Sequence, residues 1–164
     1  MSKRFKVAPI LAVVTKEKGL GQDDSVLGFL MPFEGDSLEI LADQSPDSTV
    51  PVTEEQLWDL ARGVPELSRC GVMHGDINEW NTVLCRASAS DSGSERSRLL
   101  LIDLGDEAPG YEGDEKALGS LFLWCLEHAP SLRGGPEGAQ RIRTAAAMLR
   151  DGDFDEALGA LSPR

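Results

Sequence analysis

Residues 74–81, which read HGDINEWN, hold the side chains that phosphoryl transfer requires. That reaction needs a carboxylate to orient the attacking hydroxyl and oxygen ligands for Mg²⁺, and it needs little covalent help from the protein. Asp76 can supply the carboxylate, and Asn81 can supply one of the oxygen ligands. Because Asp and Asn also accept backbone hydrogen bonds in ordinary turns, this stretch alone leaves a plain polar turn open as the alternative.

A second acidic residue follows an aliphatic run in residues 99–106, LLLIDLGD. The run ends in Asp-x-Gly, so it carries Asp103 to the end of a strand, where Gly105 allows a sharp turn. Asp103 is therefore a candidate Mg²⁺ ligand. Taken alone, this pattern also fits a carboxylate that simply ends a strand.

The elements around these residues follow from the apolar pattern. Short apolar runs at residues 81–85 and 98–104 predict two strands joined by a Ser-rich, solvated connection. Before them, residues 52–71 predict a helix with Thr53 as N-cap and with a kink or a split at Pro65. After them, residues 114–129 begin with acids and are apolar nearly all round, which predicts a buried helix.

The two ends of the chain have simpler patterns. Residues 5–15 and 25–33 are rich in apolar and β-branched side chains and predict two strands of a hairpin. Residues 135–162 predict one or two short amphipathic helices.

Composition limits the classes of partner. The chain has 164 residues, 41% of them hydrophobic, which suits one globular domain. Its net charge of -12 argues against nucleic acid or an anionic membrane as a general partner. A nucleotide ligand stays possible, because a divalent metal held by carboxylates neutralises phosphates locally.

Three separated cysteines form no CxxC pair, so we expect no zinc site and no disulfide framework, but small buried thiols in a reducing compartment. The basic and then apolar start is a poor signal peptide because it is short and contains Pro9. No stretch approaches the roughly 20 apolar residues of a membrane span. We therefore expect a cytoplasmic protein.

Taken together, the order of these motifs resembles the C-terminal lobe of the protein kinase-like superfamily. There, H-x-D-x-x-x-x-N precedes D-x-G on a small hairpin. The resemblance covers roughly residues 5–127 and implies an α+β fold, mostly the helical C-lobe plus a remnant two-stranded N-lobe hairpin. It divides a single partial domain into N-lobe strands and hinge (1–35), C-lobe core with catalytic loop and D-x-G (36–130) and short C-terminal helices (131–164).

The resemblance also implies roles for single residues. Asp76 would be the catalytic base, and Asn81 and Asp103 would bind Mg²⁺. His74, Gly105 and Asp114 would give structural support, with Asp114 accepting backbone hydrogen bonds from the catalytic loop. Val83 and Ile102 would flank the adenine of ATP from below.

The hinge offers a small physical check on nucleotide binding. If Met31 is the gatekeeper, Pro32 occupies a position that offers the adenine only a backbone carbonyl, so its missing N–H is tolerated. Glu34 then occupies the position that also offers an N–H. The alternative is a proline that ends a strand and binds no ligand.

The sequence also departs from the family pattern. It shows no Gly-rich phosphate loop, no V-A-I-K-like strand lysine and no partner glutamate, and Lys3, Lys6 and Lys16 lie in the wrong context to replace that lysine. Asn78 stands where protein kinases often have a lysine, and Gly75 replaces the arginine that would receive an activation-loop phosphate. Asp114 comes only eleven positions after Asp103, which is similar to aminoglycoside and other small-molecule kinases.

Two functions remain open at this point. The first is ATP- and Mg²⁺-dependent transfer of the γ-phosphate to a hydroxyl, with Ser or Thr of a protein favoured over a small molecule as the acceptor. The second is a truncated pseudokinase that binds a nucleotide or a partner without catalysis. Because a two-stranded hairpin leaves an unpaired edge, we also expect residues 7–14 to pair with another chain or to pack poorly.

Overall fold

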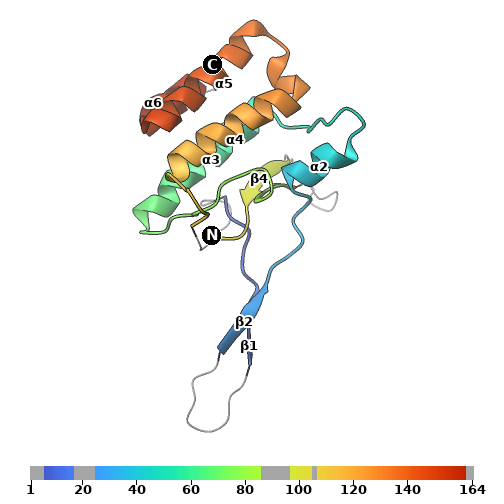
Figure 1. Cartoon of the computed structure of the whole chain (residues 1–164), viewed down its shortest axis with the longest axis vertical. Coiled ribbons are helices and arrows are strands. Elements are labelled where there is room, and N and C mark those ends of the chain that lie inside the picture. The colour runs from blue at the N-terminus through green and yellow to red at the C-terminus, as the bar shows by residue number, and fades with distance from the viewer. Residues whose placement is uncertain (1–5, 17–24, 86–96, 105–106, 162–164) are drawn as a thin grey trace, which may run out of the picture.

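The computed structural model describes residues 6–16, 25–85, 97–104 and 107–161. Figure 1 shows a stack of helices at one end and a two-stranded ribbon that projects away from it at the other. In the described part, no helix is long and apolar enough to cross a membrane. In chain order the elements are β1 (Ala12–Lys16), β2 (Ser25–Leu30), α2 (Leu38–Gln44), α3 (Glu54–Arg69), β3 (Thr82–Cys85), β4 (Arg98–Leu101), α4 (Asp114–His128), the 3-10 turn η1 (Pro130–Arg133), α5 (Pro136–Asp151) and α6 (Phe154–Leu161).

Helix α3 begins where the sequence predicts. The Gln56 N–H donates to the Thr53 hydroxyl at 3.4 Å, and the Thr53 N–H donates to the Gln56 side-chain oxygen at 2.9 Å, which is a capping box. The helix continues through Pro65, so the prediction of a split there is wrong. The roughly 3 kcal/mol cost of an internal proline is offset by buried side chains worth roughly 1.5–3 kcal/mol each. These are Leu57, Leu60, Val64 and Leu67.

Helix α4 is the buried helix that its sequence predicts. Leu118, Phe122 and Cys125 are fully buried, and α5 packs directly against α4. A Cβ at Gly119 would lie 2.8 Å from the Ala146 carbonyl oxygen, so the glycine permits this close approach. The prediction of one or two C-terminal helices is confirmed as two, α5 and α6, although α5 is long, with 16 residues.

The cysteines follow the prediction in two cases of three. Cys85 and Cys125 are buried free thiols, and burial raises the pKa of the Cys85 thiol to about 11. Cys70, at the end of α3, is exposed, so the expectation of three buried cysteines is wrong there.

The hairpin of β3 and β4 has two apolar faces, as the alternation of side chains in strands requires. One face, with Leu84, Leu99 and Leu101, packs into the main core beneath the helices. The opposite face forms a second, smaller cluster, made of Val83, Cys85 and Leu100, with Ile102 packed against it.

Both edges of this hairpin carry a further segment. On the β4 side, Val7 forms a parallel bridge to Leu101, and the Leu101 N–H donates to the Lys6 carbonyl at 2.7 Å. On the β3 side, Ser37 pairs with Val83 just before α2 begins. The single strand predicted over residues 5–15 is therefore wrong: Val7 joins the edge of the β3–β4 hairpin, and only Ala12–Lys16 pairs with β2.

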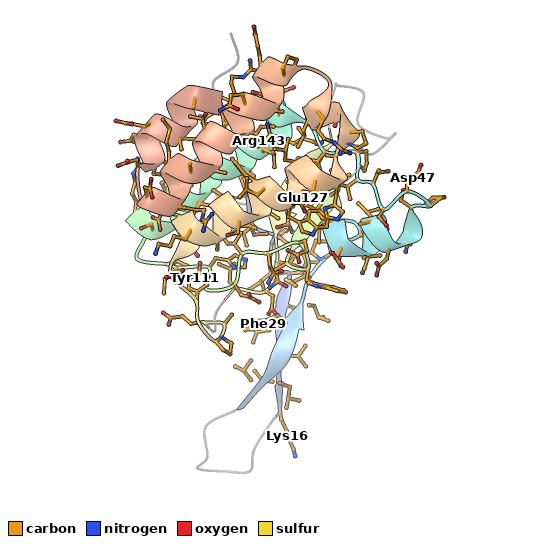
Figure 2. The ribbon with its side chains drawn as sticks, turned by 45° about the horizontal axis from the view of Figure 1, so that its top comes forward. Lys16, Phe29, Asp47, Tyr111, Glu127 and Arg143 are labelled. Carbon is orange, nitrogen blue, oxygen red and sulfur yellow. The ribbon has the colours of Figure 1, made fainter. Side chains whose placement is uncertain are left out.

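The projecting part, which we call the apolar ribbon, comprises the described residues 10–16 and 25–33. Strands β1 and β2 pair only with each other. Figure 2 shows Phe29 on this ribbon and Lys16 towards its far end. Its large apolar side chains are all at least 37% exposed: Ile10, Leu11, Val13, Val14, Val26, Leu27, Phe29, Leu30, Met31 and Phe33.

Gly35 is expected to tolerate no side chain. A Cβ at Gly35 would lie 2.2 Å from the Leu84 carbonyl oxygen, so the substitution Gly35→Ala must push the hinge segment off β3. We predict that it lowers the free energy of unfolding by about 1–3 kcal/mol in urea denaturation. Gly28→Ala is the matched control, because a Cβ there meets nothing within 4 Å. Equal stability of the two variants would contradict this packing.

Candidate functional site

The carboxylate of Asp76 is held by two asparagine side chains. Asn78 Nδ2 donates to Asp76 Oδ1 at 2.8 Å, and Asn81 Nδ2 donates to Asp76 Oδ2 at 2.7 Å. Asn81 Nδ2 also donates to the Asp76 carbonyl at 3.0 Å. Each carboxylate oxygen has a further lone pair, so the group can still accept a proton or a hydroxyl hydrogen bond. Asp76 is half-buried and is therefore both fixed and reachable.

Asn78 also shapes the turn that carries Asn81. Its side-chain oxygen accepts from the Trp80 and Asn81 N–H groups, both at 2.9 Å, which is the turn chemistry expected of Asn. The predictions gave Asn78 no role beyond marking a missing lysine. The Asp-x-Asn spacing was the signal, because a side chain two residues after Asp76 can reach back to it.

Asp103 is joined to this loop through the backbone. The Ile102 N–H donates to the Asn81 carbonyl at 2.9 Å, directly beyond the last pair of the β3–β4 ladder. His74 Nε2 lies 2.9 Å from the Ile102 carbonyl oxygen, on the other side of the same residue. Ile102 therefore contacts His74 and Asn81, the two ends of the loop, and Asp103 is the next residue. As a result, Asp76, Asn81 and Asp103 all lie at one end of the hairpin.

His74, for which a structural role was predicted, lies inside the loop. It is fully buried, and its Nδ1 lies 3.3 Å from the Asp76 amide nitrogen, so it supports the loop from inside. Burial lowers the pKa of His74 below its ordinary value, against the opposing effect of the surrounding carboxylates. A neutral ring can accept at Nδ1 and donate at Nε2, as these two contacts require.

Asp103 adopts an unusual backbone conformation. Its φ is 62°, in the left-handed region that Asp enters more readily than most residues and that often marks a functional site. The side chain is exposed and, within the described residues, has no hydrogen-bond partner. Its carboxylate is therefore available to a ligand.

Asp114 fixes the start of the loop. At the first position of α4 and only 6% exposed, it accepts the N–H groups of His74 at 2.9 Å and Gly75 at 3.2 Å, and it also accepts the Tyr111 hydroxyl. These contacts are those expected of Asp114. Tyr111 was not foreseen. Gly105, the other residue given a supporting role, lies outside the described residues.

The oxygen donors fit a magnesium ion that a nucleotide brings with it. Since Asn81 Nδ2 is used by Asp76, its Oδ1 is the atom left for a metal, and no described residue donates to it. In the described part of the chain, no three His, Cys, Asp or Glu side chains are grouped to hold a metal by themselves. Mg²⁺ commonly binds one or two carboxylates together with substrate phosphates and water, and Asn81 and Asp103 suit that arrangement.

The residues expected to contact adenine lie on one side of the hairpin. Val83 and Ile102 belong to the smaller apolar cluster, on the face opposite the main core. The hinge segment crosses next to them, because the Leu84 N–H donates to the Asp36 carbonyl at 3.0 Å. Pro32 is half-buried. The Glu34 side chain lies 3.7 Å from both Cys85 Sγ and an Arg98 nitrogen, which anchors the hinge.

Neither Lys6 nor Lys16, the two described lysines considered for the phosphate-binding role, is placed to fill it. The Lys6 ammonium forms an ion pair with Asp59 of α3. Lys16 is exposed towards the far end of the ribbon (Figure 2). Lys3, the third candidate that the sequence excluded, lies outside the described residues.

Comparisons with known proteins identify the fold. No protein-family profile matches the sequence, and no curated protein matches it. Among solved structures, the chain is similar to the PknI kinase domain of Mycobacterium tuberculosis, with a TM-score of 0.55 at 18% identity, over 95% of this chain and 72% of that one. A double mutant of the same domain gives a TM-score of 0.59 at 16% identity, over 96% of this chain and 70% of that one. These matches establish an α+β, protein kinase-like fold.

We predict that Asn78→Ala destabilises the protein by about 1–3 kcal/mol, because it removes one donor from Asp76 and one acceptor from two backbone N–H groups. Urea denaturation measures the change. Gln140→Ala is the control, since its exposed side chain makes only a 3.5 Å contact with Thr144. If the two variants were equally stable, Asn78 would not hold the loop.

Proposed function

We propose that this chain, which has a protein kinase-like fold, transfers the γ-phosphate of ATP to a hydroxyl, with Ser or Thr of a protein as the favoured acceptor. The observation that carries the proposal is the pair of contacts at Asn81. Its amide nitrogen donates to the Asp76 carboxylate, and its carbonyl accepts the N–H of the residue before Asp103. These contacts bring the backbone that leads to Asp103 next to the loop that carries Asp76 and Asn81, which supports the proposal.

Each residue has one task in this proposal. Asp76, held by Asn78 and Asn81, accepts the hydrogen bond of the acceptor hydroxyl and takes its proton at a carboxylate oxygen. Asn81 Oδ1 and Asp103 would hold Mg²⁺, which when bound neutralises charge on the phosphates. Adenine would lie against the apolar cluster of Val83 and Ile102, near Glu34 of the hinge, whose side chain lies 3.7 Å from Cys85 of the same cluster. Pro32 is the other hinge residue proposed to contact it.

The acceptor would be bound without an extended activation segment. Only ten residues lie between Asp103 and Asp114, so the usual peptide platform is short. A protein acceptor would then be recognised through contacts elsewhere on the surface, and a small-molecule acceptor stays the alternative within the same reaction.

We predict that ATP and Mg²⁺ together raise the melting temperature, whereas neither does so alone, because the described acids do not form a metal site by themselves. Asp103→Ala should abolish the shift, since it removes a metal ligand. Asp76→Ala should keep the shift but lower phosphate transfer by at least about a hundredfold.

The metal assignment and the base assignment can be refuted independently. A shift of the same size in Asp103→Ala and in the wild type would refute the metal assignment. Equal transfer by Asp76→Ala and the wild type would refute the base assignment. Glu127→Ala, an exposed acid on α4 (Figure 2), is the control for loss of one negative charge.

A second candidate function is a non-catalytic binding module, which the apolar ribbon favours. Its ten exposed side chains present on the order of 800 Å² of apolar surface, comparable to the ~800 Å² per partner of a stable interface. We infer that the partner is a second copy of this chain. Lys16 is the single charged residue in the described part of the ribbon, so two ribbons can meet without the repulsion that a net charge of -12 imposes elsewhere.

We predict a concentration-dependent dimer in sedimentation equilibrium, abolished by Phe29→Lys, which places a charge in the cross-strand pair with Val13. Val72→Lys is the matched control, because it adds the same charge at an exposed apolar site outside the ribbon and should leave the dimer intact. A wild-type chain that stays monomeric at all concentrations would rule out this second function.

A further inference from the structure

The strongest unassigned feature of the site is the hydroxyl of Tyr111, which donates to Oδ1 of Asp114. The same oxygen accepts the Gly75 N–H at 3.2 Å, while Oδ2 accepts the His74 N–H at 2.9 Å. We propose that Tyr111 is a positioning residue: it fixes the Asp114 carboxylate, which accepts the N–H groups of His74 and Gly75, and thereby orders the catalytic loop. This inference rests on the proposed phosphotransferase function.

The sequence before Tyr111 explains how its side chain reaches this carboxylate. The Tyr111 N–H donates to the Ala108 carbonyl at 3.0 Å, which closes a four-residue turn. Pro109 and Gly110 occupy the two central positions, and Gly110 has a φ of 79°, as a type II turn requires. The turn sends the chain back towards α4, and Figure 2 shows Tyr111 below the start of that helix.

The same turn also contacts the catalytic loop directly. The Ala108 N–H donates to the Gly75 carbonyl at 3.1 Å. Gly75 therefore bonds through its N–H to Asp114 and through its carbonyl to Ala108, with a φ of 88° that few other residues adopt. Gly75 stands where protein kinases carry the arginine that binds an activation-loop phosphate. In this chain, the hydrogen bond from Ala108 to Gly75 connects the short segment to the loop, and no phosphate is involved.

The chemistry of Tyr111 suits a permanent donor. Burial, together with the hydrogen bond to the Asp114 carboxylate, raises the pKa of Tyr111 well above its ordinary value, with Glu115 adding to the effect and the Gly75 backbone opposing it. The hydroxyl keeps its proton throughout the neutral range. The hydroxyl therefore remains available to donate to Asp114 at neutral pH, and this contact needs no activating modification.

Tyr111→Phe tests the inference, because it removes only the hydroxyl. Hydrogen exchange of the His74 and Gly75 amides should become at least about tenfold faster, as expected for loss of a hydrogen bond to a charged group. Phosphate transfer should fall in kcat by about tenfold, with KM for ATP unchanged, since adenine and metal contacts lie elsewhere. Ser120→Ala is the matched control: it removes an exposed hydroxyl of α4 that bonds to the Lys116 carbonyl.

A second measurement uses the wild type. Tyr111 is the single tyrosine of the chain, so phenolate absorbance reports it alone. In the native protein it should not ionise near pH 10, the ordinary value, and should do so in urea.

Unchanged exchange in Tyr111→Phe, or a native phenol that ionises near pH 10, would overturn the inference. A rise in KM for ATP with kcat unchanged would do so as well. If the wild type transfers no phosphate but exchange still rises in Tyr111→Phe, the proposed function fails while the tie between Tyr111 and the loop stands.

Discussion

The hydrogen bond from the Ile102 N–H to the Asn81 carbonyl, 2.9 Å long, joins the two loops that make the site. It continues the β3–β4 ladder by one step, so its position is set by the register of that hairpin. The register in turn is fixed by burial, because a slip of one residue would turn Leu99 and Leu101 out of the main core. Core packing therefore fixes the hairpin register, and that register places the backbone of Asp103 next to Asn81.

A second set of contacts fixes the loop against the helices. His74 is buried and reaches Asp76 and Ile102 through its ring, while Asp114 holds its backbone from the start of α4. Since α4 is among the most buried helices, the carboxylate of Asp114 cannot move without the core. Asp76 therefore sits on a rigid support, as its proposed role of orienting a substrate would require. The apolar ribbon has no comparable support, and its exposed side chains are the reason to expect a partner there.

The parts of the fold that the sequence predicts are those with strong local signals. Thr53 and Gln56 form a capping box that is visible in the sequence, and the apolar run of α4 admits only burial. The missed helix α2 is short, although Ser37 as N-cap and the spacing of Leu38, Leu41 and Ala42 could have revealed it. The bridge of Val7 to Leu101 joins residues far apart in the chain, and no local pattern indicates it. Within the site, residue order along the chain predicts the carboxylates, whereas Tyr111 is found only because a turn folds back on Gly75.

The most direct test of the account follows Mn²⁺, which replaces Mg²⁺ and broadens nearby resonances, in spectra of the chain with a non-hydrolysable ATP analogue. If Asn81 and Asp103 bind one metal ion beside Asp76, the side-chain amide of Asn81 and the backbone amides of Asp76 and Asp103 broaden together at the lowest Mn²⁺ concentration. Broadening that begins instead at the acids of α6, such as Asp155 and Glu156, or that leaves the Asn81 amide sharp, would contradict the convergence of these side chains on a single cation.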